Sequence, residues 1–518
     1  MIDGESSGKC WYDHKEGEDS LMDVIRINER DRVVVAPMGL HKGQSVKVAG
    51  REILVLDDIP PCHKMAVENI AAGDRVLKYG CPFGVATKDI QQGQWAHTHN
   101  VRTALEGILS YQYEPRLEGA KIGEEEEKYF QGYLRKDNQA GIRNYIFIIP
   151  TVQCANTSAQ KIAAQANALF PVSDCFDGFI VLPHAYGCCQ TGNDLLNMQR
   201  ILAGLARNPN AGGTLFLSLG CEVNAPSVFK PILGDVDPDA VKILIMQEVG
   251  DEIEEGLKRC REIYEYVNAF RRTSVPFSKL IVGVNCGGSD GLSGITANPL
   301  VGEVSSMIIR RGGSVIMTEV PEMFGAEQFL MNRAQDEKIY NAIVGMINDY
   351  KAYFESHGES AIGNLTQGNQ AGGLTTLEEK SLGCIQKSGT AVVTDVLLSG
   401  QRYRKPGLVL LSSTGNDFIG VTSQIVAGCN LIVFTTGRGT PGGFAAPTFR
   451  ISSNTGLYEQ KKHWIDFNAG ILLDGSDIQE TAVSLYDKIA QTINGEYHTR
   501  NEVNKYFEIG IFKQGITI

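Results

Sequence analysis

The sequence lacks the features that mark membrane, secreted and nucleic-acid-binding proteins. No run of eighteen or more apolar residues occurs in its 518 residues, so no membrane-spanning helix is expected. The first twenty residues are polar and acidic and have neither the basic start nor the apolar stretch of a signal peptide. The net charge is −12, and no block rich in lysine and arginine is present. We therefore expect a cytoplasmic protein with neither a membrane nor a nucleic acid as partner.

The cysteines are too few for a disulfide scaffold. The chain has twelve of them in 518 residues, and no two stand in a Cys-x-x-Cys pair. Thiols of a cytoplasmic protein stay reduced. Each cysteine is therefore either a small buried side chain or a candidate metal ligand.

Changes in composition and hydrophobic pattern divide the chain into five parts. Residues 1–20 form a polar leader, and residues 21–108 predict a small domain of short strands and turns. Residues 109–128 are a linker that includes four successive glutamates. We expect an α/β catalytic domain over residues 129–360 and a second, C-terminal α/β domain over residues 361–518.

Short apolar runs recur after residue 130, and each leads into a polar or Gly-rich turn. Such runs suit strands that are buried on both faces of a parallel sheet. Helical patterns separate several of them, for example over residues 194–207 and 251–270. The alternation predicts an α/β body with mostly parallel, Rossmann-like sheets, whose ligands bind beyond the carboxyl ends of the strands. The runs are YIFIIP, GFIVLP, GTLFLSLG, KLIVGVN, SVIM, LVLLSS and LIVFTT.

Four cysteines follow such runs at equivalent positions. Thiolates bind zinc, iron and iron–sulfur clusters well, whereas a single cysteine is more often a small buried side chain. Four thiols at strand ends leave both interpretations open. They are Cys154, Cys188, Cys221 and Cys286.

Two histidines, His97 and His99, lie near the end of the β-rich domain in the string Trp-Ala-His-Thr-His-Asn. In an extended segment, residues two apart face the same side. Both imidazoles are therefore expected to meet one metal ion or one substrate, as general acid or base or as ligands. The alternative is a polar strand end that faces solvent.

The segment from Cys286 to Asn298 is rich in glycine and in side chains that form hydrogen bonds. Glycines let the backbone approach a ligand, and a turn into a helix N-terminus suits a carboxylate. The segment is neither a Walker A loop nor Gly-x-Gly-x-x-Gly, so it does not support a nucleotide cofactor. An ordinary Gly-rich turn is the alternative. The side chains expected to contact a substrate are Ser289, Asp290, Thr296 and Asn298.

Three weaker signals complete the set. Arg438 is flanked by glycines after a buried run, which suits bidentate carboxylate binding or an exposed turn. His63 and Lys64, at the start of an expected short helix, would contact an acid group or form a surface pair. Glu319 and Glu322 would act as a base or as ligands.

Together these motifs resemble the altronate/galactarate dehydratase family over residues 23–518. So many strings in one order are hard to reach by chance. The most specific are Lys78-Tyr79-Gly80, His97-Thr98-His99-Asn100, Leu219-Gly220-Cys221-Glu222, the fourteen residues from Cys286 to Pro299, the nine from Glu319 to Glu327, the five from Glu379 to Gly383, the seven from Phe434 to Thr440, and the five from Lys462 to Asp466.

The resemblance implies a function, a cofactor and an N-terminal domain similar to the SAF (antifreeze-like) fold. The implied activity is a hydro-lyase reaction on a hexonate, most closely D-altronate to 2-keto-3-deoxy-D-gluconate, in hexuronate (galacturonate) catabolism. The implied cofactor is iron(II) or manganese(II). The expected partner is a small sugar acid, and a homo-oligomer stays open.

The expected roles follow from the motifs and the resemblance together. The small domain ends in paired histidines and the body gathers cysteines at strand ends, so the site is predicted between the two. We expect metal or cluster ligands at Cys188, Cys221 and Cys286, and catalytic groups at His97, His99 and Glu319. Substrate contacts are expected from His63, Lys64, Asn100, Ser289, Asp290, Thr296, Asn298 and Arg438.

Two departures from the family pattern concern the substrate more than the reaction. Cys62 stands where glycine usually precedes His63, and residues 365–369 replace a usual Ser-Pro-Gly-Asn. Two alternatives therefore stay open. One is a dehydratase of a related, galactarate-like sugar acid that uses a [4Fe–4S] cluster. The other is a sugar-acid-binding paralogue without catalysis.

Overall fold

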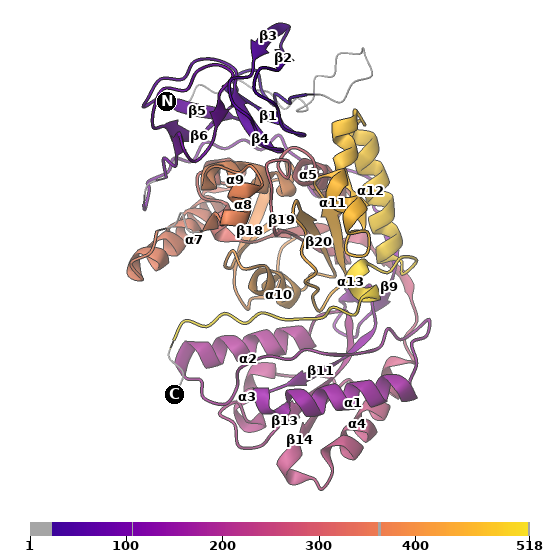
Figure 1. Cartoon of the computed structure of the whole chain (residues 1–518). Helices are drawn as coiled ribbons and strands as arrows, with labels where there is room; N and C mark the ends of the chain where they lie inside the picture. The colour runs from indigo at the N-terminus through magenta and orange to yellow at the C-terminus, as the bar shows by residue number, and fades with distance from the viewer. Residues whose placement is uncertain (1–22, 106, 361–363, 516–518) are drawn as a thin grey trace.

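The computed structural model describes residues 23–105, 107–360 and 364–515, so the polar leader predicted over residues 1–20 lies outside the described residues. Figure 1 shows a small β domain at the N-terminus, an α/β domain at the opposite end of the molecule, and a larger α/β domain between them. This arrangement confirms the predicted fold class. None of the described helices combines the length and hydropathy needed to cross a membrane.

The N-terminal domain consists of short antiparallel strands. They form sheets of order β1-β4-β7, β5-β6-β8 and β2-β3. The bounds are β1 Val33–Ala36, β2 Ser45–Val48, β3 Arg51–Leu54, β4 His63–Ala66, β5 Arg75–Lys78, β6 Cys81–Ala86, β7 Trp95–Ala96 and β8 Val101–Arg102.

Strand β4 replaces the short helix predicted around His63 and Lys64. It lies between β1 and β7, where His63 pairs with Ala36 and Lys64 pairs with Val35 and Ala96. All four residues of β4 are buried. Pairing on both sides overrides the local helical preference, so the two residues lie inside a sheet and not at a helix start.

The second domain is built on a parallel sheet of order β12-β11-β13-β14. In β11, Ile146 and Ile148 face the apolar cluster under α1 and α4, while Phe147 and Ile149 face the cluster under α2 and α3. Burial on both faces explains the unbroken apolar run. The bounds are β11 Tyr145–Pro150, β12 Phe179–Val181, β13 Ala211–Ser218, β14 Val241–Ile245, α1 Asn156–Leu169, α2 Gly192–Ala206, α3 Pro226–Leu233 and α4 Glu252–Val267.

The largest domain holds a seven-stranded parallel sheet of order β18-β19-β17-β16-β20-β21-β22. The strand bounds are β16 Ile281–Cys286, β17 Ser314–Met317, β18 Val393–Leu398, β19 Leu408–Ser412, β20 Leu431–Thr436, β21 Thr448–Ser452 and β22 Phe467–Asn468. The helices are α5 Ala297–Arg310, α6 Glu327–Met331, α7 Glu337–Ser356, α8 Gln367–Ala371, α9 Leu377–Cys384, α10 Asp417–Ala427, α11 Thr455–Gln460, α12 Ile478–Ile493 and α13 Arg500–Val503.

This sheet runs across the predicted domain boundary at residues 360/361. Strands β16 and β17 precede that point, while β18 to β22 follow it, and all pair in one sheet. The antiparallel sheet β10-β9-β15 joins the two α/β domains, with β9 at Tyr129–Leu134, β10 at Ala140–Gly141 and β15 at Thr273–Pro276. The α/β part therefore divides before β16, and α8 occupies most of the loop expected at residues 365–369.

Candidate active site

The N-terminal domain meets the large domain through a buried ion-pair triad. Lys64 Nζ and Lys78 Nζ each lie 2.8 Å from one oxygen of Glu379 in α9. The Thr375 amide donates to the same carboxylate at 2.8 Å. All three charged side chains are almost completely buried. One carboxylate of the large domain thus pairs with two ammonium groups of the small domain.

The triad shifts the pKa of each member. Burial alone would raise the pKa of Glu379, but the charges of Lys64 and Lys78 outweigh it and lower that pKa to about 2. Burial lowers the pKa of Lys64 to about 8. For Lys78, the charge of Glu379 outweighs burial and raises the pKa. Glu379 is therefore ionised at neutral pH, and Lys64 is the ammonium group that loses its proton most easily.

Beside the triad, two histidines of the small domain lie against each other. The ring centroids of His63 and His97 are 4.6 Å apart, and Trp95 stacks on His97. Trp95 Nε1 donates to His63 Nδ1 at 3.2 Å, so His63 carries its proton on Nε2. His97 Nδ1 is 3.0 Å from the Thr375 hydroxyl of the large domain.

Both imidazoles are neutral at physiological pH. Burial, then the charge of Lys64, lowers the pKa of His63 to about 4 and that of His97 to about 3. A neutral imidazole next to an ammonium group accepts a proton from a substrate or binds a metal ion.

His99 does not join this pair. Strand β7 ends at Ala96, and Asn100 closes a turn by accepting the His97 amide and donating to the Trp95 carbonyl. His99 is therefore exposed, with its ring 5.0 Å from that of Trp95. The imidazole that lies against His97 is thus His63, and not His99 as expected for an extended segment. Asn100 shapes the turn.

A small cavity of about 10 Å³ lies beside the triad. Its lining combines the Gly-rich segment, the triad and the start of the next charged cluster. The residues are Tyr79, Ser289, Asp290, Ser293, Gly294, Asn298, Leu374, Glu379, Lys380 and Gly383.

Beyond Lys380 lies a second buried cluster at the carboxyl end of β16. Cys286 Sγ and Cys384 Sγ donate to Glu322 Oε2 at 3.0 and 3.1 Å. Lys387 Nζ lies 2.8 Å from Cys286 Sγ and 3.0 Å from Cys384 Sγ. Lys380 Nζ is 2.8 Å from Glu322 Oε1. Two thiols, carboxylates and two ammonium groups therefore share one enclosed site.

The cluster is charge-balanced when two of its acids are ionised. A hydrogen bond from Cys384, supported by Lys387, lowers the pKa of Cys286, whereas that bond and burial raise the pKa of Cys384. Burial and the charge of Glu322 raise the pKa of Glu319. Lys380 and Lys387 outweigh burial at Glu322 and lower its pKa to about 2. Glu322 is therefore ionised and faces the two ammonium groups, while Glu319 is the carboxyl that keeps its proton.

Comparison with known proteins bears on what these clusters do. Family models for the altronate/galactarate dehydratase SAF domain, the D-galactarate dehydratase/altronate hydrolase second domain and the D-galactarate/altronate dehydratase C-terminal domain match residues 22–104, 132–268 and 277–517. The chain belongs to the D-galactarate/altronate dehydratase family. This confirms the resemblance seen in the motifs, and the matched segments follow the three domains of the fold.

Three relatives match over nearly their whole length. An altronate dehydratase of Bacillus subtilis (strain 168) is 44% identical over 504 residues, covering 96% of this chain and 100% of the relative. An altronate dehydratase of Escherichia coli (strain K12) is 42% identical over 497 residues, with the same shares. A galactarate dehydratase (L-threo-forming) of Escherichia coli (strain K12) is 31% identical over 504 residues, covering 92% of this chain and 93% of the relative.

The donor atoms of the second cluster suit the metal that the family resemblance implies. One ligand atom each of Cys286, Glu319, Glu322 and Cys384 lies within 4.8 Å of the others. Glu319 Oε1 is buried without a hydrogen-bond partner among the described residues. Lys387 already places a positive charge against both sulfurs. These four residues could therefore hold a metal ion.

The three cysteines expected to share one ion do not come together. Cys286 lies in the buried cluster, whereas Cys188 and Cys221 are exposed on the second domain, at the carboxyl edge of its sheet. Cys384, which joins Cys286 in the buried cluster, lies at the end of helix α9. Its position at a helix end could not be recognised from the pattern of cysteines that follow apolar strands. Glu379 and Lys380 were inside a quoted family string, but nothing in their local pattern indicated buried charges.

Most of the polar side chains predicted to bind substrate are held by the protein itself. Asp290 accepts from Ser293, Ser453 and Asn454, and burial raises its pKa. Thr296 donates to the Ser453 carbonyl at 2.7 Å. Asn298 donates to the Gly383 carbonyl and accepts from Thr435. Asp290 and Asn298 line the small cavity. Ser289 lines it too, and its carbonyl accepts from Asn369 of α8 at 2.9 Å.

Arg438 lies at the rim of this region. Its amide donates to the Gly288 carbonyl at 2.8 Å, its side chain is exposed, and its guanidinium forms no ion pair with any described residue. Burial raises the pKa of the Cys62 thiol to about 12, and the positive charge of Arg438 acts against this rise. Arg438 is thus an exposed cation beside the Gly-rich segment.

Cys62 brings the small domain into direct backbone contact with the large one. A Cβ on Gly373 would lie 2.1 Å from the Cys62 carbonyl oxygen, and one on Gly291 would lie 2.2 Å from it. Cys62 itself has φ 69°, a left-handed conformation that favours glycine. The family's usual glycine at this position therefore has a conformational reason.

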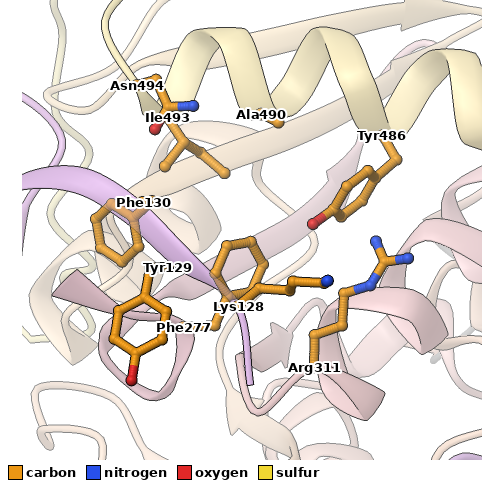
Figure 2. A pocket seen from close by; sticks show the side chains of 9 residues that line it. All are labelled: Lys128, Tyr129, Phe130, Phe277, Arg311, Tyr486, Ala490, Ile493 and Asn494. Carbon is orange, nitrogen blue, oxygen red and sulfur yellow. The ribbon is translucent and has the colours of Figure 1, made fainter. Parts of the chain in front are cut away.

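A larger cavity of about 240 Å³ lies elsewhere, between β9 and α12 (Figure 2). Arg311 points across it toward Tyr486, with its guanidinium carbon 4.3 Å from the ring centroid. It contains no histidine, cysteine or acidic side chain. The lining residues are Lys128, Tyr129, Phe130, Phe277, Arg311, Tyr486, Ala490, Ile493 and Asn494.

Proposed function

We propose that this protein is a hydro-lyase that dehydrates D-altronate to 2-keto-3-deoxy-D-gluconate in hexuronate catabolism. The relatives named altronate dehydratase are 44% and 42% identical, compared with 31% for the galactarate dehydratase. The observation that carries the proposal in the structure is the neutral pair His63 and His97, enclosed beside Lys64 at the domain junction. The partner is then a small sugar acid.

The reaction needs a base, an acid and positive charge. A base removes the C2 proton, the C3–O bond breaks, and the C3 hydroxyl leaves as water after it gains a proton. The resulting enol becomes a ketone. The C2 proton is weakly acidic because the neighbouring carboxylate is already negative, so cations must stabilise the charge that develops.

We assign these roles to residues at the junction. His97 accepts the C2 proton, because its imidazole is neutral and held by Thr375. His63 gives its Nε2 proton, which bonds to the Ala371 backbone before substrate binds, to the leaving hydroxyl. Lys64 and Arg438 supply positive charge to the carboxylate. In this scheme Ser289 and Asp290, which were expected to contact the substrate, form one wall of the small cavity beside it.

Iron(II) or manganese(II) is the proposed cofactor. Cys286, Glu319, Glu322 and Cys384 would hold the ion, and a bound ion supplies positive charge that polarises substrate oxygens. Glu319, which would lose its proton on binding the ion, is then a metal donor and not the base. His99 has no role in this scheme.

A substrate panel tests the proposal. Purified protein is assayed under anaerobic conditions against hexonates and hexarates, with iron(II), manganese(II) or no added metal. The expected result is a 2-keto-3-deoxy acid formed from D-altronate faster than from any hexarate, with a rate that rises on metal addition. Turnover of hexarates alone would support the galactarate-like alternative, and binding without turnover would support a non-catalytic paralogue.

A further inference from the structure

The carboxyl edge of the four-stranded sheet carries thiols that the proposed active site does not use. Cys154, Cys188 and Cys221 are all exposed there. Free cysteine is among the most buried residue types, so three exposed thiols on one edge are not explained by packing. The cysteines of the large domain and of helix α4 show the usual behaviour, since Cys260, Cys286, Cys384 and Cys429 are buried.

The strand order brings these thiols together. Cys154 follows β11, Cys188 follows β12 and Cys221 follows β13, and the strands lie side by side in the order β12-β11-β13 (Figure 1). Neighbouring strands are about 4.8 Å apart. The Cys189 thiol donates to Cys188, with their Sγ atoms 3.6 Å apart.

Backbone hydrogen bonds fasten the three loops to one another. The Gln153 amide donates to the Tyr186 carbonyl at 2.8 Å, which ties the Cys154 loop to the Cys188 loop. The Val223 amide donates to the Cys188 carbonyl at 3.4 Å, which ties the Cys188 loop to the Cys221 loop. The thiols therefore project from one connected backbone frame.

A buried carboxylate and a glycine hold the loops of the exposed thiols close to the end of β11. Glu222, next to Cys221, is 5% exposed and accepts from Thr151 Oγ1 at 2.7 Å and from Ser218 Oγ at 2.6 Å. Gly187, next to Cys188, has φ 102°, and a Cβ there would lie 2.2 Å from the Thr151 carbonyl oxygen. Both neighbours of the exposed thiols are thus anchored to the end of β11, as expected of preorganised ligands.

The spacing of the thiols argues against a single ion. Thiolates at about 2.3 Å from zinc lie about 3.8 Å from one another in a tetrahedron. Among the described residues, the one set of three or more candidate ligand atoms within 4.8 Å is the Cys286 cluster. The three edge thiols are therefore too far apart to surround one ion. An iron–sulfur cluster is larger, and thiolates are its usual ligands.

We propose that Cys154, Cys188 and Cys221 hold a [4Fe–4S] cluster, at a site separate from the domain junction. The cluster binds by ligand exchange. Each thiol gives its proton to a small thiolate that leaves one iron, and its sulfur takes that position, so three irons become protein-bound and the oxidation state is unchanged. The fourth iron keeps a ligand from outside the protein. Cys188, and not the half-buried Cys189, is the ligand because its thiol is exposed.

Loading with a synthetic cluster tests this site without reference to dehydration. Full-length protein, reduced and kept anaerobic, is mixed with a [4Fe–4S] cluster that carries small-thiolate ligands, and is then desalted. Iron, acid-labile sulfide and the broad absorption near about 400 nm are measured. We expect about four irons and four sulfides per chain, and loss of most of both in Cys154→Ser, Cys188→Ser and Cys221→Ser.

Two control variants separate this site from the rest of the chain. Cys175→Ser, in the same domain but before β12, and Cys286→Ser, in the buried cluster, are expected to load like the wild type. Because the three ligands are exposed, their serine variants should keep the wild-type circular dichroism. The proposal is overturned if the wild type takes up no cluster, if the three variants load normally, if Cys286→Ser fails to load, or if the edge thiols bind one zinc ion in place of a cluster.

Discussion

His97 and His99 stand two positions apart, yet only His97 is enclosed at the domain junction. Its ring lies between Trp95 and His63 and reaches Thr375 of the large domain. His99 is exposed and contacts Trp95 alone among the described rings. The turn closed by Asn100 creates this difference. Two histidines two positions apart in the sequence therefore differ in burial and in their partners.

Replacing the two histidines separately tests the assignment of the base. His97→Gln keeps a group that can bond to Thr375 but cannot take up a proton, so we expect kcat/KM for D-altronate to fall by about 10²–10⁴-fold. His99→Gln is the matched control and should change kcat/KM little. Steady-state kinetics at neutral pH measure both. Equal activity in the two variants would remove His97 from the mechanism.

At this scale the sequence predicts part of the site. Strand-end position singled out Cys286, and the family strings singled out His97 and Glu319. Lys78 and Glu379 were not predicted as site residues, because they meet across 301 positions of sequence. A buried ion pair leaves no local pattern: each partner alone is typical of an exposed surface residue.

Elements buried on both faces were the most predictable part of the fold. The unbroken apolar runs became β11, β13, β16, β19 and β20. Strand β21 was missed because it alternates polar residues, yet it is buried. Two nitrogens of its Arg450 donate to the carbonyls of Gly442 and Trp464, which only the folded chain supplies.

Helix α9 carries the carboxylate on which the junction depends. Glu379→Gln would leave Lys64 and Lys78 buried without the carboxylate that pairs with both, so we expect the free energy of unfolding at pH 7 to fall by about 3–5 kcal/mol. The pKa of Glu379 is depressed to about 2 from 4.5. Its contribution is therefore present above about pH 4.5 and is lost as the pH falls toward 2, where the variant and the wild type should converge. Urea unfolding between pH 3 and 7 measures the difference.

An exposed pair provides the control for this prediction. Glu254 and Lys258 form an i,i+4 pair on α4 at 3.1 Å, and both side chains are largely exposed. Glu254→Gln should cost less than about 0.5 kcal/mol at any pH, because solvent screens the pair. If Glu379→Gln costs no more than this control, the buried triad does not stabilise the junction.

The whole molecule is held together by contacts between segments far apart in the chain. The seven-stranded sheet takes strands from both sides of residue 360, so loop composition near that point misplaced the predicted division. Which strands share a sheet depends on pairing across long distances, and local composition does not report it. That the site lies between the small domain and the body stays a prediction, and Lys64, Lys78 and Glu379 meet at that junction.

Cutting the chain between the domains tests whether this junction alone keeps the small domain in place. Gly107 and Ile108 are exposed, so a specific protease site can be inserted between them without burying new residues. After cleavage, we expect the two fragments of the wild type to elute together from a size-exclusion column, in low salt and in about 1 M salt alike, because buried ion pairs are screened little. The same cleavage in Glu379→Gln should release the N-terminal fragment. Glu68→Gln, which breaks the partly exposed pair with Arg32 inside the small domain, should leave the fragments associated. Separation of the cleaved wild type, or continued association in Glu379→Gln, would show that other contacts decide the position of the small domain.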